Sequence, residues 1–229
     1  MRLVLTLFGV FALSPIATTA QSNPWWEVYT GYQFGRADFV NGPQNLANSI
    51  TVPAGLPAVN AGPTLNTNGF EFSVQENSSR WWGGIADFSG QYGVRNIDAS
   101  GLAQALGLVP AGTRVIAHFH PSAYTLAYGP QFTHRGWGSL EGFARVMAGG
   151  ARSYLSPDTF SRKALTLAAP RFNSDGTSFA LIAGAGFDYP WKHRIVFRIA
   201  EDYIRTFLYN DGQNNFRLSG GIAFRFGRR

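Results

Sequence analysis

Large apolar residues occupy every second position along eight segments of this chain. The segment at the carboxyl end shows the pattern clearly. One of its faces carries large apolar side chains: Phe216, Leu218, Ile222, Phe224 and Phe226. The other face carries small, polar or charged side chains: Arg217, Ser219, Gly221, Ala223 and Arg225. A period of two predicts a β-strand, and this division between the faces is typical of a strand between lipid and a polar lumen.

The eight segments are long enough to cross a membrane as tilted strands. They cover Trp26–Phe39, Asn68–Asn77, Arg80–Gly93, Ser122–Thr133, Trp137–Arg152, Thr177–Tyr189, His193–Phe207 and Asn215–Phe226. A tilted strand needs about 9–11 residues to cross the hydrocarbon, and each segment has about that many or more. The sequence therefore predicts an all-β protein, a single transmembrane antiparallel up-and-down β-barrel of eight strands.

Short and long connections alternate between these segments. The short ones are Ser78-Ser79, His134–Gly136 and Pro190–Lys192, and the long ones are Val40–Thr67, Val94–Pro121 and Ser153–Gly176, with the shorter Leu208–Asn214 last. Outer-membrane barrels have this plan, with short periplasmic turns and longer external loops. A barrel of ten strands is the alternative, because Thr113–His120 and Lys163–Ala168 also alternate. We interpret both as extensions of strands beyond the membrane.

The amino-terminal residues have the features of a secretory signal peptide. Met1-Arg2 supplies a positive charge, Leu3–Leu13 is apolar, and Thr18–Ala20 puts small residues before a cleavage point. The apolar part is too short to span a bilayer as a helix, which needs about 20 residues. We therefore assign residues 1–20 to a signal peptide and residues 21–229 to the barrel domain; a buried or anchoring helix is the alternative. The chain has no cysteine, so disulfides do not stabilise it.

Composition fits a protein that alternates between lipid and a polar interior. Aromatic residues make up 15% and charged residues 14% of the chain, which also has 27 glycines. This combination favours β-structure in contact with lipid. The formal net charge is +6. Because the signal peptide directs export, we expect no nucleic-acid partner, and attraction to anionic lipopolysaccharide or polysaccharide explains the basic balance better.

All six tryptophans lie at the ends of the predicted strands that meet the short turns. They are Trp25, Trp26, Trp81, Trp82, Trp137 and Trp191. Tryptophan prefers the membrane–water interface, where its apolar ring and its polar N–H are both satisfied. Aromatic residues of an ordinary core would be scattered along the strands. The pattern predicts an aromatic girdle at the periplasmic rim.

The last strand also carries a short motif of polar, glycine and aromatic residues. Ser219 is followed by Gly221, Phe224 and Phe226 at the spacing of the insertion signal of bacterial outer-membrane barrels, although Gly227-Arg228-Arg229 follow the final aromatic. With this motif and the eight-segment plan, the chain resembles the OmpA-like eight-stranded outer-membrane barrels, without a peptidoglycan-binding domain. The resemblance implies a Gram-negative outer-membrane location, and partners that include membrane lipid, the barrel-assembly machinery and periplasmic chaperones. We expect a monomer.

If the apolar faces meet lipid, the opposite faces carry many charges into the lumen, among them Glu27, Asp202 and Arg225. Counted from the turns, six of them fall at similar depths: Glu71, Asp87, Glu141, Arg145, Arg198 and Arg217. Buried charges are tolerated when they are paired and hydrogen-bonded. An eight-stranded barrel has just enough interior for side chains. We therefore predict a closed lumen filled by one ion-pair network, and the alternative is a soluble barrel or sandwich with these residues in water.

One short stretch has residues suited to catalysis. His118, His120 and Ser122 lie two residues apart, which resembles the base and nucleophile of outer-membrane lipid A deacylases. The Asn-Ala that follows the serine in that family is absent, and Glu141 is at the far side of the membrane, so a triad is not expected. The two histidines share a strand face, but a metal site would need a third ligand. We predict no catalytic, metal or cofactor site.

The sequence thus predicts a non-enzymatic outer-membrane protein whose external loops serve adhesion or surface contact. A narrow-pore channel is the alternative, and a lipid A-modifying enzyme is the third hypothesis. Within the second long connection, Ala99–Leu108 is expected to form a short helix with Ser100 as its N-cap.

Overall fold

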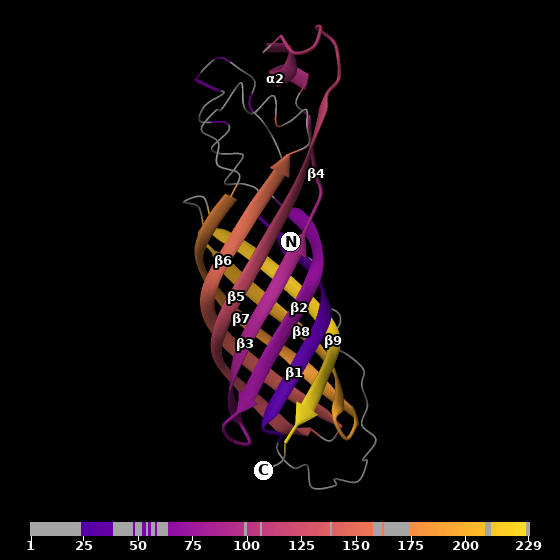
Figure 1. The fold of residues 1–229 in the computed structure, drawn as a ribbon, viewed down its shortest axis with the longest axis vertical. Helices are drawn as coiled ribbons and strands as arrows, with labels where there is room; N and C mark the ends of the chain where they lie inside the picture. Colours follow the sequence, from indigo (N-terminus) through magenta and orange to yellow (C-terminus); the bar gives the residue numbers. More distant parts are fainter. Residues whose placement is uncertain are drawn as a thin grey trace.

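The strands close into one barrel, with an extension at one end (Figure 1). The structure is a computed structural model, and it describes residues 24–38, 48, 52, 53, 55, 58, 64–98, 100–105, 107–137, 139–157, 162, 175–208 and 212–227. The predicted signal peptide, residues 1–20, lies outside the described residues. Within the described residues, no helix is both long and apolar enough to span a membrane.

Nine strands and one short helix make up the described fold. They are β1 (Trp26–Ala37), β2 (Leu65–Asn77), β3 (Trp82–Tyr92), β4 (Arg95–Asp98), α2 (Ser100–Ala105), β5 (Ile116–Trp137), β6 (Leu140–Pro157), β7 (Asp175–Lys192), β8 (Ile195–Thr206) and β9 (Gln213–Phe226). The sheet order is β3-β2-β1-β9-β8-β7-β6-β5-β4, and every pairing is antiparallel. Because β3 also pairs with β5, eight strands close into a barrel, and β4 is added only at its end. The eight-stranded antiparallel barrel is confirmed.

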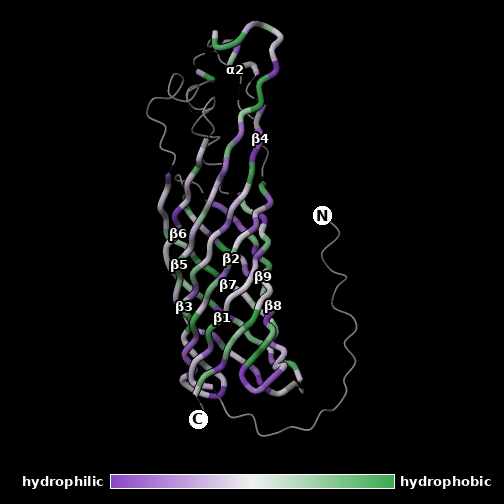
Figure 2. The backbone as a smooth tube through the Cα atoms, turned by 45° about the vertical axis from the view of Figure 1, so that its right-hand side comes forward, coloured by the Kyte–Doolittle hydropathy of each residue, from purple (hydrophilic) through white to green (hydrophobic). Residues whose placement is uncertain are grey.

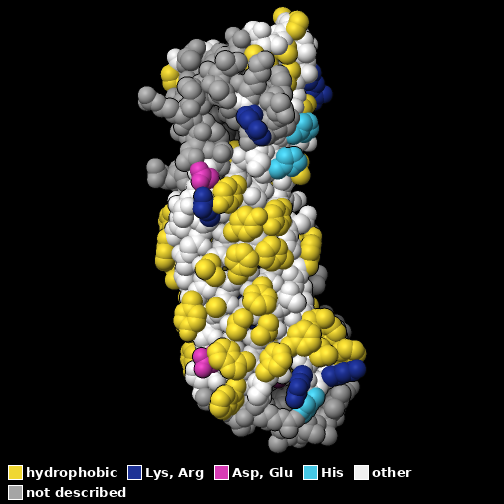
Figure 3. All heavy atoms as spheres, in the orientation of Figure 1, with side chains coloured by type: hydrophobic (Ala, Val, Ile, Leu, Met, Phe, Trp, Pro, Cys, Tyr) yellow, Lys and Arg dark blue, Asp and Glu magenta, His cyan; other side chains and the backbone are white. Residues whose placement is uncertain are grey.

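Hydrophobic and hydrophilic residues alternate along the strands (Figure 2), and the burial of their side chains separates an apolar outside from a largely polar inside. In β9 the burial pattern is strictly alternate over its first eight residues. Large outward side chains such as Tyr128, Val146 and Ile199 are 60–66% exposed, and apolar spheres cover much of the barrel wall in Figure 3. Exposing an apolar belt of this size to water would be unfavourable, so this surface is suited to contact with lipid.

The ends of the barrel differ. At one end short turns join the strands; there Ser79 Oγ accepts hydrogen bonds from the backbone N–H groups of Trp81 and Trp82 at 3.2 and 3.0 Å. At the other end the connections are long. Outer-membrane barrels place long connections outside the cell, and we call this the external end.

Strands β5 and β6 run past the barrel at the external end. β5 begins at Ile116, so Thr113–His120 contributes to an extension that pairs with β4 and is not a further barrel strand. Lys163–Ala168 lies outside the described residues. The predicted helix is present but shorter, as α2, Ser100–Ala105. The prediction of Ser100 as the N-cap is wrong. Asp98, two residues earlier, has this role, because its carboxylate accepts a hydrogen bond from the Ser100 N–H at 3.0 Å. This bonding with Ser100 holds the pKa of Asp98 below its usual value.

Candidate functional site

Five charged side chains form a buried ion-pair cluster in the lumen. Arg145 on β6 donates to Asp202 of β8 at 2.8 Å from Nε and 2.6 Å from Nη2, and to Glu71 of β2 at 2.8 Å. Arg217 on β9 bonds to Asp202 at 2.9 Å and to Asp87 of β3 at 3.1 Å. All five side chains are at most 1% exposed. We call this the upper cluster; it joins five strands across the lumen.

Six further charged side chains form a second cluster nearer the short turns. Arg198 donates to Asp188 at 2.7 and 2.8 Å and to Glu27 at 3.0 Å. Arg225 donates to Glu141 at 3.0 and 2.6 Å, and Arg135 lies 3.0 Å from Glu27 and 3.3 Å from Glu141. Three guanidinium groups thus face three carboxylates in this lower cluster, so its formal charges cancel.

The prediction of one network at one depth is wrong in its arrangement. The structure brings Glu71, Asp87, Arg145 and Arg217 together, but it places Glu141 and Arg198 in the lower cluster. Counting residues from the turns ignores strand tilt, which shifts the depth of a residue between neighbouring strands.

Two members of the lower cluster were missed in the sequence. Asp188 follows inward-facing Gly184 and Gly186 at a period of two, so the alternation of β7 already indicated its direction. Arg135 lies near a turn, where the β5–β6 register shifts between His134 and Trp137, and alternation carries no information there.

The remaining lumen is filled by other side chains. Ile85, Ala127, Met147, Ile182 and Ile204 form a buried apolar cluster inside the barrel, an inward apolar group that the predicted polar lumen did not include. The Arg198 guanidinium lies 4.7 Å from the ring centroid of Phe143 and 5.5 Å from that of Tyr29.

A cavity lies on the side of this filling that faces the external end. Its volume is about 20 Å³, and its lining includes Gln91, Thr125, Leu208 and Asn215. A cavity of this size holds about one water molecule. The side chains that line this cavity leave no room for a larger ligand at this position.

The tryptophans lie at the short-turn end. Trp25, Trp26, Trp82 and Trp191 are 43–55% exposed. Trp81 stacks on Phe132 with ring centroids 5.9 Å apart, and the Lys192 ammonium lies 4.5 Å from the Trp191 ring centroid. Trp137 ends β5 at the same rim, although its side chain lies outside the described set. The described rings suit an interface in which one edge meets lipid and the other water.

The residues of the predicted insertion signal divide between the two faces of β9. Ser219 is buried in the lumen, and Phe224 and Phe226 are 40% and 47% exposed on the outside. Gly221 also faces inward, and a Cβ there would overlap the Thr30 carbonyl oxygen and the Gly31 Cα of β1. This glycine therefore permits the close contact at which the last strand meets the first.

The three residues considered for catalysis lie on the outward face of β5 near and above the external rim. His118 and His120 are exposed, and Ser122 is opposite Tyr92 of β3 and Tyr154 of β6. His118 Nδ1 lies 2.8 Å from Asn96 Oδ1. Among the described residues, no group of three His, Cys, Asp or Glu side chains could hold a metal ion.

The closed barrel and its exposed apolar belt can be compared with known proteins. No model of a protein family matches the chain, and no curated protein matches it. The solved structure of Neisserial surface protein A matches with a TM-score of 0.55 at 10% identity, covering 88% of this chain and 97% of that one. The chain has the eight-stranded outer-membrane β-barrel fold. Its resemblance to the OmpA-like barrels is thereby confirmed at the level of the fold.

Other solved outer-membrane proteins also match, with lower TM-scores. Ail of Yersinia pestis has a TM-score of 0.46 at 16% identity, covering 87% of this chain and 97% of that one. OprG of Pseudomonas aeruginosa has a TM-score of 0.47 at 12% identity, covering 91% and 99%. The fold and the apolar belt place the protein in the bacterial outer membrane.

Proposed function

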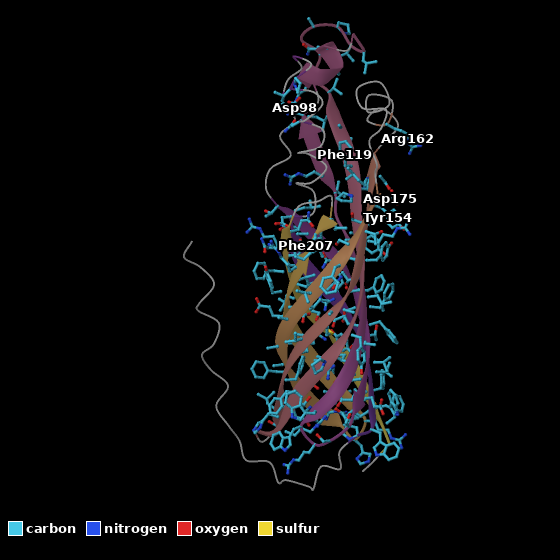
Figure 4. All side chains as sticks on the ribbon, turned by 90° about the vertical axis from the view of Figure 1, so that its left-hand side faces the viewer. Asp98, Phe119, Tyr154, Arg162, Asp175 and Phe207 are labelled. Carbon is cyan, nitrogen blue, oxygen red and sulfur yellow. The ribbon has the colours of Figure 1, made fainter. Side chains whose placement is uncertain are left out.

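We propose that the protein is a non-enzymatic component of the outer membrane that presents its external extension for adhesion or surface contact. The observation that carries this proposal is the extension itself, which continues the barrel wall outward as β4, β5 and β6 (Figures 1 and 4). In Figure 4, Asp98 and Phe119 lie beyond Tyr154, Asp175 and Phe207 along the long axis. A rigid scaffold that holds a protruding surface is a common basis for recognition.

The tip of the extension is an ordered unit. The Val115 N–H donates to Ser100 Oγ at 2.9 Å, and Gln104 Nε2 donates to the Thr113 carbonyl at 3.0 Å. Ala103 is only 1% exposed. These contacts tie α2 to the segment that leads into β5, so the tip can present a defined surface to a partner.

As part of the same proposal, the external rim contacts lipopolysaccharide. Arg36, Arg152 and Arg205 all project outward near this rim. The Arg152 guanidinium lies 4.9 Å from the ring centroid of Tyr154, whose ring packs edge-on against Tyr124 at 6.3 Å. Guanidinium groups bind phosphate well and aromatic rings favour the interface. Assembly by periplasmic chaperones and the barrel-assembly machinery is also proposed from the outer-membrane location.

A narrow pore is the second candidate, and one observation favours it. Gln33 Oε1, Ser73 Oγ and Gln131 Oε1 are buried in the lumen and have no hydrogen-bond partner among the residues that the structure describes. Buried polar atoms of this kind are commonly satisfied by water, so a file of water molecules could pass the clusters. The two buried ion-pair clusters favour a closed lumen more strongly than these atoms favour a pore.

Planar-bilayer recordings separate the two candidates. A closed barrel gives no steady conductance, whereas a narrow pore gives discrete openings that respond to Arg145→Met, which removes a side chain from the upper cluster. Steady openings of the unmodified protein would contradict the closed lumen.

The adhesive role is tested by replacing residues 99–113 with a short Gly-Ser turn. Cells that express this variant should lose retention on surfaces to which cells with the unmodified protein adhere. The matched control replaces Ser78-Ser79, at the opposite end, with Asn-Gly and should keep full retention. A gel shift between unheated and boiled samples shows that both barrels fold. Equal retention of the two variants would refute the adhesive role.

A further inference from the structure

Glu201 carries a carboxylate on the lipid-facing side of the barrel. It is the seventh of the twelve residues of β8, and its neighbour Asp202 points into the lumen with 0% exposure. Glu201 itself is exposed, and its register partners are Ala185 on β7 and Leu218 on β9. Its carboxylate makes no hydrogen bond or ion pair with a residue that the structure describes.

The surroundings of Glu201 are apolar and lie near the middle of the membrane. Ile199, on the same strand face, is 61% exposed, and Leu218 is 52% exposed. The other outward-facing charges among the described barrel strands lie toward the strand ends or the external rim: Arg36, Glu76, Arg152, Asp175, Lys192 and Arg205. A charge on the lipid face is destabilising in proportion to its depth, so an unpartnered one at mid-depth indicates a function.

Small residues lie beside this carboxylate on the β7 and β6 side, whereas Ile199, Tyr203 and Leu218 next to it are large and exposed. Ala183 and Ala185 lie on β7, and Ala144, which pairs with Ala185, lies on β6. On β9, a Cβ added at Gly220 would meet nothing within 4 Å. Small outward residues let another protein surface approach closely within a membrane. The carboxylate therefore borders a low surface over β6 and β7, where a partner can approach it closely.

A second copy of this chain fits the surface best. Insertion gives both copies the same orientation, so a two-fold axis between them runs along the membrane normal, and each residue meets residues at its own depth. Glu201 at the centre of such an interface meets Glu201 of the second copy. Two carboxyl groups that hold a proton between them form a strong hydrogen bond. Acyl chains offer no such partner.

We propose that strands β6–β9 pack against the same strands of a second copy, with Glu201 hydrogen-bonded to its counterpart at the centre of the interface. This homodimer replaces the monomer expected from the sequence. The interface is on the outside of the barrel, so it leaves the lumen clusters and the external tip unchanged.

Cysteine crosslinking in outer membranes tests the proposal, because the natural chain has no cysteine. Ala185→Cys puts a thiol one strand away from Glu201, too far from its counterpart for a direct disulfide, so a membrane-permeant bismaleimide should join the two thiols into a covalent dimer of about twice the chain mass. The matched control is Ala86→Cys on β3, also an exposed alanine inside its strand. β3 is four strands from β8 in either direction around the barrel, so this thiol faces away from the interface and should stay monomeric.

Substitutions of Glu201 in the Ala185→Cys background test the hydrogen bond. Glu201→Leu should reduce the crosslinked fraction roughly tenfold. Glu201→Gln keeps a donor and an acceptor and should retain the dimer. The gel shift on boiling, measured for each variant, separates loss of the dimer from loss of the barrel. Equal crosslinking from positions 185 and 86, unchanged crosslinking with Glu201→Leu, or a product of any other mass would overturn the proposal.

Discussion

Replacing Arg145 by methionine tests whether the upper cluster stabilises the barrel as a network. Arg145 is 1% exposed and makes three short hydrogen bonds, one to Glu71 and two to Asp202. The substitution leaves Arg217 alone among three carboxylates, Glu71, Asp87 and Asp202. Removing one partner of a buried ion pair costs about 3–5 kcal/mol, because the remaining charges stay desolvated.

Urea unfolding in lipid vesicles measures this cost. Tryptophan fluorescence and the gel shift should report the same transition, with an unchanged slope and a lower midpoint. The control is Arg152→Met, the same substitution in an exposed pair: Arg152 lies 3.2 Å from Asp175, and their side chains are 53% and 39% exposed. Solvent screens that pair, so we expect a loss of less than about 1 kcal/mol.

A second substitution tests the role of charge. Asp202→Asn added to Arg145→Met restores the native excess of one carboxylate over the guanidinium groups of the cluster. The double variant should therefore lose about 0.5–3 kcal/mol less unfolding free energy than the sum of the losses in the two single variants. The reasoning is refuted if Arg145→Met costs no more than Arg152→Met, or if the two losses in the cluster simply add.

Three further predictions follow from other parts of the barrel. Gly221→Val should abolish the gel shift on boiling, because its side chain would overlap β1 at Thr30; a normal shift would show that the seam tolerates it. Trp82→Ala should cost about 1 kcal/mol in the same urea assay, since Trp82 packs edge-on against Phe132 with centroids 5.2 Å apart, and a loss above that of Arg145→Met would contradict a rim position. Expression of the unmodified protein or of Ser122→Ala should leave the mass spectrum of lipid A unchanged, whereas an acyl chain lost only with the unmodified protein would establish a deacylase.

The sequence by itself determined which way most side chains face. Alternation is a local property of the extended backbone, so Phe224 could be assigned to lipid and Arg217 to the lumen without knowing their neighbours. The same reasoning located the eight strands, the tryptophans at the short turns and the ends of the connections. It failed near turns, as at Arg135, where the register shifts and the period of two is interrupted.

Only the tertiary structure decided which charges meet. Arg145 reaches Glu71 and Asp202 from strands that are distant in sequence, and Glu141 and Arg198 belong to another level, because strand tilt and closure fix the depth of each residue relative to the others. The inward apolar cluster around Met147 and the isolated position of Glu201 were likewise decided by the tertiary structure. A period of two tells which face a side chain occupies, but its partners depend on the register of the whole closed sheet, which no local pattern contains.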